Sequence, residues 1–157
     1  MGETHNRRKT LQVMAVGSIG LAMGTQLPGV AQQKPTPVRI STLQGVLAKE
    51  WDTLEYTFDG AAALLLRVPK PAEDDQRALL VRRGNETLYL VSYLLICTHQ
   101  GCKPALPNLE RNLVCPCHGS TFKAADGSVV RGPARQMLEG IRLEVRDGTI
   151  FAVGLLP

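Results

Sequence analysis

Four cysteines and two histidines lie close together in two short segments of this 157-residue chain. The first segment, residues 97–102, reads CTHQGC, and the second, residues 115–120, reads CPCHGS after 12 intervening residues. A disulfide framework that braces a whole fold spreads its cysteines along the sequence. The clustering therefore indicates a local metal site or a local covalent link between two loops.

Each segment offers one thiolate and one imidazole at short spacing, Cys97 with His99 and Cys115 with His118. Two such loops bring two sulfur atoms to one iron and two nitrogen atoms to a second iron. A cluster of two irons with this mixed ligation is a known one-electron carrier, and neutral imidazole ligands raise its reduction potential. The spacing therefore predicts a 2Fe-2S cluster.

The same segments carry one further cysteine each, Cys102 and Cys117. These two residues are placed to link the loops covalently, which requires an oxidising compartment. Two other interpretations use the same residues. A zinc knuckle usually spaces its ligands Cys-x2-Cys or His-x3–5-His, and neither spacing occurs here. Two plain disulfides would leave both histidines unexplained, so we favour the cluster.

The two motifs resemble the cluster-binding loops of the Rieske family, in its disulfide-containing respiratory branch. The resemblance covers residues from about 38 to 157. It implies that Cys97 and Cys115 bind the inner iron, that His99 and His118 bind the outer iron, and that Cys102 and Cys117 form the disulfide beside the cluster.

The resemblance extends to a third loop, in which Gly132, Pro133 and Ala134 match the proline loop that covers the cluster in this family. Ser120 matches a serine whose hydroxyl donates to a bridging sulfide. High-potential members carry a tyrosine donor two residues later, where this chain has Phe122. Fewer hydrogen bonds stabilise the reduced cluster less, so we expect a potential below that of members with both donors.

The elements that must position these loops read as an all-β domain. Short β-like runs, separated by turn residues such as Asp59-Gly60 and Asp147-Gly148, are expected at the following positions: 54–58, 62–68, 78–82, 87–92, 113–115, 141–145 and 149–153. Residues 42–51 are predicted to form one or two helical turns. The family resemblance implies a Rieske fold, an antiparallel β-sandwich over residues 41–157 with an inserted cluster-binding subdomain at about 95–138.

The N-terminal part of the chain carries export signals. Arg7 and Arg8 precede a weakly apolar stretch, which resembles a twin-arginine signal for proteins exported already folded around a cofactor. Residues 1–31 are therefore expected to be a signal cleaved after Ala31 or, through residues 11–27, a membrane anchor. A Pro-containing linker at 32–40 would follow. Whether the segment is cleaved or retained, the domain is expected in the periplasm or on the outer face of the membrane.

Charge and composition argue against nucleic acid as a binding partner. A formal charge of +4 and an aromatic content of 4% leave neither a basic face nor a stacking platform for nucleic acid. Apolar residues at Leu106, Pro107, Leu109, Met137 and Leu138 form either a rim around the histidines that docks on a partner or ordinary packing.

The resemblance leads to two candidate functions. The first is electron transfer as the iron-sulfur subunit of a quinol:cytochrome c reductase, beside a cytochrome b-like subunit and a c-type cytochrome. There, His99 or His118 accepts a hydrogen bond from quinol and takes its proton as the cluster takes an electron. The alternative is the small subunit of a periplasmic molybdenum oxidoreductase resembling arsenite oxidase, beside a molybdopterin subunit. Rieske ferredoxins and oxygenases are disfavoured because they generally lack the spare cysteines.

Overall fold

The structure is a computed structural model that describes residues 36–44, 47–72 and 77–157. The expected signal or anchor segment, residues 1–31, lies outside these described ranges. Strands and turns make up the described residues, which contain no helix, so the all-β prediction is confirmed. A search of the described residues for a helix able to cross a membrane finds none.

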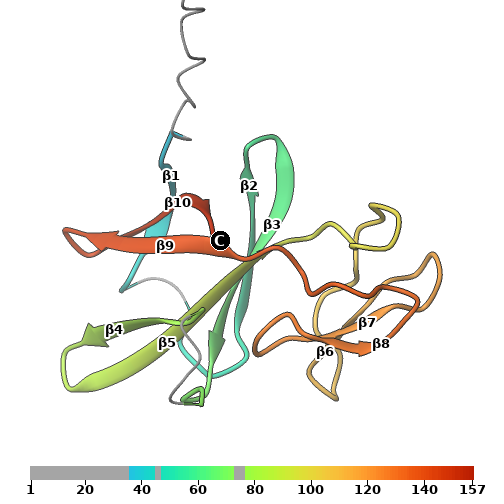
Figure 1. Cartoon of the computed structure of the whole chain (residues 1–157). Coiled ribbons are helices and arrows are strands. Elements are labelled where there is room, and N and C mark those ends of the chain that lie inside the picture. The colour runs from blue at the N-terminus through green and yellow to red at the C-terminus, as the bar shows by residue number, and fades with distance from the viewer. Residues whose placement is uncertain (1–35, 45–46, 73–76) are drawn as a thin grey trace, which may run out of the picture. The chain divides into compact units, whose positions relative to one another are not determined.

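Within these described ranges, ten strands form three antiparallel sheets (Figure 1). The strands are β1 (Val38–Thr42), β2 (Thr53–Phe58), β3 (Ala61–Val68), β4 (Leu79–Arg83), β5 (Glu86–Leu94), β6 (Asn112–Val114), β7 (Thr121–Lys123), β8 (Val129–Arg131), β9 (Ile141–Arg146) and β10 (Thr149–Leu155). The sheet orders are β1-β10-β9, β2-β3-β5-β4 and β6-β7-β8.

All seven predicted β-runs form strands, and the structure adds β1, β7 and β8. The predicted helical turns at 42–51 are wrong for the described residues, because Thr42 ends β1 and the chain then continues through turns and bends. β1 also takes up residues 38–40, which the sequence had assigned to the linker. It forms by pairing with β10, where Val38 lies opposite Ala152, a partner 114 positions away that no local pattern reveals.

Two Asp-Gly turns close hairpins as predicted. Asp59 and Gly60 (φ 48° and 78°) join β2 to β3, and Asp147 and Gly148 (φ 49° and 70°) join β9 to β10. Both residues of a type I′ turn need positive φ, which aspartate tolerates and glycine adopts without cost. These turns fix the register of the hairpins that frame the sandwich.

The sheet β2-β3-β5-β4 is the middle layer of the fold, and β3 is buried on both faces. Leu65 packs with Leu143 and Ile150 of the β1-β10-β9 sheet on one side. Leu64 and Leu66 point to the other side and pack with residues that follow β5. Successive side chains of a strand alternate between faces, so one strand supplies both cores.

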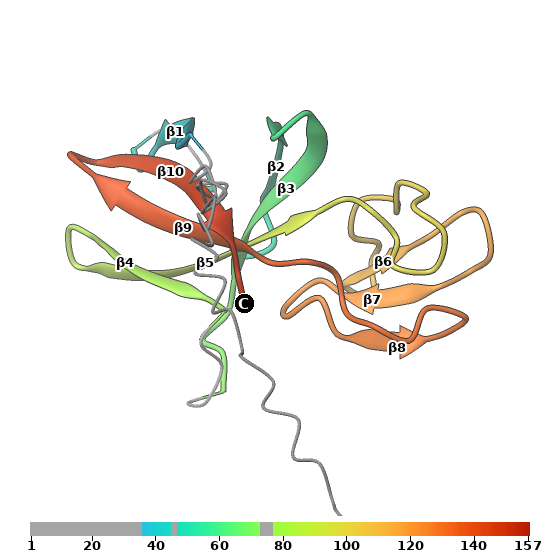
Figure 2. The same ribbon diagram turned by 45° about the horizontal axis from the view of Figure 1, so that its top comes forward.

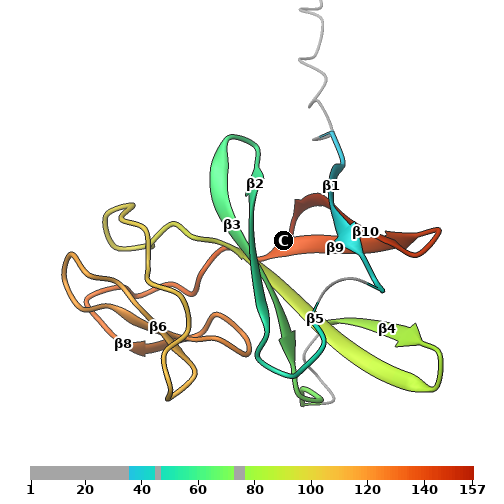
Figure 3. The same ribbon diagram turned by 180° about the vertical axis from the view of Figure 1, so that it is seen from behind.

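Between the end of β5 and the start of β9 the chain leaves the sandwich and forms the small sheet β6-β7-β8. Figures 2 and 3 show this insert as a lobe on one side of the central sheet. Its core holds the fully buried side chains of Leu113, Phe122 and Leu138, next to Tyr93 of β5. Complete burial of an aliphatic or aromatic side chain of this size contributes roughly 1.5–3 kcal/mol.

Polar contacts also attach the insert to the sandwich. Lys103 forms an ion pair with Glu55 of β2. The guanidinium of Arg111 lies 5.0 Å from the ring centroid of Trp51, within the range of a cation–π interaction. Exposed ion pairs contribute little to stability, so the apolar core rather than these contacts holds the insert in place.

A second ionic cluster lies in the sandwich. Glu86 accepts hydrogen bonds from Arg83 (2.8 Å) and from the buried Arg67. Arg67 also donates to the carbonyl of Ala48 (2.7 Å), so it ties the segment before β2 to the β4–β5 hairpin. The hydrogen bond from Arg83, and then that from Arg67, lowers the pKa of Glu86 below its ordinary value.

Candidate metal centre

The two predicted metal-binding segments fold into loops with the same hydrogen-bond pattern. The amide of Cys97 donates to the carbonyl of Cys102 and that of Gly101 to the carbonyl of Cys97, both at 2.8 Å. In the second loop, Cys115 donates to Ser120 (2.7 Å) and Gly119 donates back to Cys115 (2.9 Å). Each glycine has a φ above +70°, which explains why glycine occupies the fourth position after each cysteine.

Each loop buries its first cysteine and carries its histidine nearer the surface. Cys97 and Cys115 are 2% and 1% exposed, and both are free thiols. His118 is exposed and His99 is half-buried, and their ring centroids lie 4.9 Å apart with the planes nearly perpendicular. The arrangement gives a sulfur side facing the core and a nitrogen side facing solvent.

His99 Nδ1 is buried and has no hydrogen-bond partner among the described residues. A buried polar atom without a partner costs free energy, so nearly all such atoms in native proteins are paired. The nitrogen points to a ligand that the polypeptide itself does not supply.

The surroundings of the Cys97 thiol favour its ionised form. Burial raises its pKa, but this effect is outweighed by hydrogen bonds from the backbone amide of His99, the Cys115 thiol, the Ser120 hydroxyl and the backbone amide of Gln100. The pKa of Cys97 therefore lies below its ordinary value. Thiolate is the form that binds a metal.

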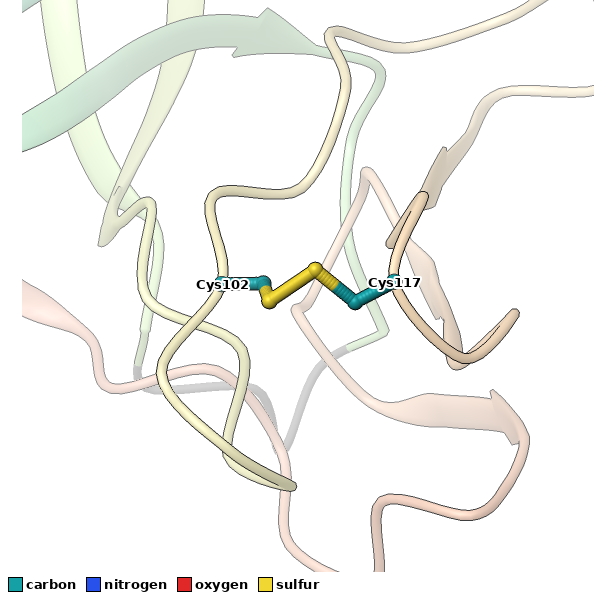
Figure 4. The surroundings of a disulfide bond; sticks show 2 residues. All are labelled: Cys102 and Cys117. Atoms are coloured by element: carbon teal, nitrogen blue, oxygen red, sulfur yellow. A yellow bond between two sulfur atoms is a disulfide. The ribbon is translucent and has the colours of Figure 1, made fainter.

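A disulfide joins the two loops, as Figure 4 shows. Its partners are Cys102 and Cys117, with an S–S distance of 2.01 Å. The Sγ atom of Cys115 lies with both disulfide sulfurs in a group whose members are within 4.8 Å of one another. These three atoms are not a metal site in this state, because disulfide sulfurs have no thiolate to donate. Cys115 is the one available thiol of the group.

A third segment closes the site. The amide of Ala134 donates to the Ser120 hydroxyl (2.9 Å), and both residues are buried. Because the Ser120 oxygen accepts this bond, its own hydrogen remains available to donate to the Cys97 thiol. Pro133, which follows Gly132 through a cis peptide bond, lines a surface depression together with His99 and Ala134.

Sequence reasoning missed several residues of this site. The Thr98 hydroxyl donates to the carbonyl of Gln136 (2.5 Å) and so ties the first loop to the third segment. Arg135 and Gln136 line the same depression as His99. No motif marks Thr98, because its partner lies 38 positions away and offers only a backbone carbonyl.

The five apolar residues for which the sequence left open a docking rim or ordinary packing are only partly at the surface. Leu138 is fully buried in the core of the insert, so for this residue the packing alternative is confirmed. Leu106, Leu109 and Met137 are 43%, 92% and 41% exposed.

Two buried thiols and two neighbouring imidazoles, one with an unpaired buried nitrogen, make a donor set that fits a 2Fe-2S cluster of mixed ligation.

Known proteins resemble this chain in both sequence and fold. The profile of the Rieske [2Fe-2S] domain matches residues 63–142. The Rieske iron-sulfur subunit of the cytochrome bc1 complex from Streptomyces lividans is 31% identical over 128 residues, which cover 77% of this chain and 73% of that protein. The chloroplastic cytochrome b6-f complex iron-sulfur subunit of Arabidopsis thaliana is 30% identical over 138 residues, or 82% and 57% of the two chains. The chain spans 35% of the matching Streptomyces coelicolor subunit.

Among solved structures, the plasma membrane Rieske protein of Synechocystis aligns with a TM-score of 0.51 at 22% identity, over 76% of this chain and 99% of that one. A quaternary ammonium Rieske monooxygenase aligns with a TM-score of 0.53 at 17% identity, over 76% and 32% of the two chains. At these identities the likeness shows the fold alone. The profile match over half of the chain and the Streptomyces lividans relative go further, and the chain belongs to the Rieske family, whose domain binds one 2Fe-2S cluster.

Proposed function

We propose that this chain carries electrons as the iron-sulfur subunit of a membrane quinol:cytochrome c reductase. The observation that supports this best is the likeness over 128 residues to a subunit of a cytochrome bc1 complex, together with cluster loops joined by a disulfide. Its partners would be a cytochrome b-like subunit that binds quinol and a c-type cytochrome that accepts the electron.

We propose that Cys97 and Cys115 bind the inner iron and that His99 and His118 bind the outer one. The burial of both thiols and the exposure of His118 support this assignment. So does the unpaired Nδ1 atom of His99, because a metal bond would satisfy it. The Ser120 hydroxyl, held by the amide of Ala134, would donate its hydrogen to the cluster.

When bound, the cluster supplies reversible one-electron transfer. The imidazole nearer the substrate would accept a hydrogen bond from a quinol hydroxyl and then hold its proton at the nitrogen that does not face iron. Pro133 and Ala134 line the surface depression beside His99, where a partner would approach the imidazole. The disulfide keeps the two loops, and so the two imidazoles, at a fixed separation.

We further propose that residues 1–31 direct export of the folded protein by the twin-arginine pathway and that residues 11–27 can anchor it to the membrane. Arg7 and Arg8 before a weakly apolar stretch support this. Carbonate washing of native membranes tests the anchor: an anchored protein stays in the pellet, and a cleaved, unattached one is released.

The test of the function is purification of the full tagged chain from its own membranes, followed by haem spectroscopy and an assay of quinol-dependent cytochrome c reduction. We expect b-type and c-type haem in the purified complex, and activity that is lost in His118→Ala and kept in Arg82→Gln. Arg82 is an exposed residue of β4 in the sandwich. Co-purification of a molybdenum-containing subunit without b-type haem would instead identify the arsenite-oxidase-like alternative and overturn the proposal.

A further inference from the structure

Positive charge gathers in the insert rather than in the sandwich. Between residues 95 and 138 the chain carries five cationic and two acidic residues, namely Lys103, Arg111, Lys123, Arg131 and Arg135 against Glu110 and Asp126. The other described residues carry nine cationic and eight acidic side chains, so they are nearly balanced. The part of the molecule that holds the proposed cluster is therefore the basic part.

Two of these cations already have partners, and the arginines beside the proline loop do not. Lys103 pairs with Glu55, and Arg111 lies over Trp51. Arg131 and Arg135 are exposed, and neither side chain makes an ion pair or hydrogen bond within the described part of the chain. Two guanidinium groups that form no ion pair within these described residues attract carboxylates, which they bind through paired hydrogen bonds.

The position of these arginines connects them to the exposed histidine side of the site. Arg135 lines the same depression as His99 and Pro133. Arg131 is the last residue of β8 and precedes the proline loop by one position. The next acidic residue along the chain, Glu139, does not line this depression but an adjoining one, and the two depressions share Thr98 and Gln136.

We propose that Arg131 and Arg135 bind carboxylates of the protein that exchanges electrons at His99, so that this partner carries an acidic surface around its redox centre. The inference rests on the proposed electron transfer through His99 and adds the charge of the partner. An anionic lipid surface would also attract arginines. The shared depression favours a protein, because electron exchange requires its redox centre to approach the imidazole.

Stopped-flow kinetics test the proposed role of the arginines. The experiment measures the rate of electron transfer from the reduced holoprotein to two purified c-type cytochromes, one acidic and one basic, across a range of ionic strength. Opposite charges accelerate association at low salt, and the effect is screened as salt rises. We expect the rate with the acidic cytochrome to fall with salt. Arg135→Gln should lower the low-salt rate about fivefold, as loss of one ion pair in water implies, and should flatten the salt dependence. Arg131→Gln should act in the same direction.

Arg82→Gln is the matched control, because Arg82 is an exposed arginine of β4, on the opposite side of the domain from β6-β8 in Figure 1. This control should keep the wild-type salt dependence, and Arg135→Lys should retain most of it. An unchanged salt dependence in both Gln variants, or an equal change in Arg82→Gln, would overturn the inference.

Two further readouts separate the outcomes. Electron paramagnetic resonance of each variant reports the cluster: its absence from the wild-type protein would contradict the proposed function, whereas a normal signal with a flat salt dependence contradicts only the role of the arginines. Sedimentation with phosphatidylglycerol vesicles tests the lipid surface. Vesicle binding that Arg135→Gln abolishes, with no change in the salt dependence of electron transfer, would refute the proposal of a protein partner.

Discussion

Removal of the disulfide between the cluster loops should destabilise the protein, and more so without the cluster than with it. The suitable change is the double substitution Cys102→Ser/Cys117→Ser. The single change Cys102→Ser would leave an exposed Cys117 thiol, and Cys117 already lies in a group of sulfurs within 4.8 Å of the Cys115 thiol. A new disulfide could then form and obscure the result.

The expected magnitude follows from the length of the loop that the disulfide closes. Cys102 and Cys117 are 15 positions apart. Closing a loop of this length restricts the unfolded chain by about 3 kcal/mol. For a domain of this size, that corresponds to a fall in melting temperature on the order of 10 °C.

The bound cluster should reduce this effect. If Cys97 and Cys115 hold the same iron, the two loops are already cross-linked in the holoprotein, and the disulfide then restricts the unfolded chain less. We therefore expect the full loss of stability in the apoprotein and a smaller one in the holoprotein. The reduction potential should also fall, because looser loops hold the donors to the cluster less well.

The assay is thermal unfolding at one fixed scan rate, followed by circular dichroism for both forms and by cluster absorbance for the holoprotein. The control is wild-type protein measured with and without a reductant that opens the Cys102–Cys117 disulfide but leaves the cluster intact. Equal melting temperatures for wild type and double variant in both forms, with an unchanged midpoint potential, would show that the bridge contributes nothing.

Three further predictions concern single side chains. Phe122→Tyr should raise the midpoint potential on the order of 50 mV, because a new hydrogen bond stabilises the reduced cluster by about 1 kcal/mol. Protein-film voltammetry that shows no upward shift would exclude this hydrogen bond. Ser120→Ala should lower both the reduction potential and the free energy of unfolding. The loss of stability should be about 1–3 kcal/mol, because the substitution leaves the buried Ala134 amide without its acceptor. An unchanged denaturant midpoint would contradict this loss of stability. Glu86→Gln should lower the melting temperature at pH 7, and the difference should close in acid, because a lowered pKa stabilises the folded state only until the pH falls through that pKa. A difference between wild type and Glu86→Gln that does not shrink at all as the pH falls below the ordinary pKa of a glutamate would contradict the assigned role of Arg83 and Arg67.

The strands of the sandwich were predictable because their signals are local. The dipeptides Asp59-Gly60 and Asp147-Gly148 predict hairpin turns, and β-branched or aliphatic runs flank them. The strands that sequence reasoning missed depend on distant partners. β7 and β8 are three residues each and form around the buried Phe122, and β1 forms only against β10. The expected helical turn at 42–51 failed because the start of that segment pairs in a sheet instead.

The chemistry-bearing residues of the site were visible in the sequence because metal ligands are constrained in type and spacing. Their supporting contacts were not visible. The bond from Thr98 to Gln136 and that from Ala134 to Ser120 each join residues at least 14 positions apart, and each uses a backbone group that every residue possesses. The apolar residues gave no better guide, since Leu138 proved to be core while Leu109 is almost fully exposed.

The central claim is that one cluster is held by two imidazoles, those of His99 and His118. Pulsed electron paramagnetic resonance of the reduced holoprotein, labelled with 15N only in histidine, measures this directly. We predict hyperfine coupling to two histidine nitrogens. A spectrum with one histidine coupling or none would contradict the proposed ligation.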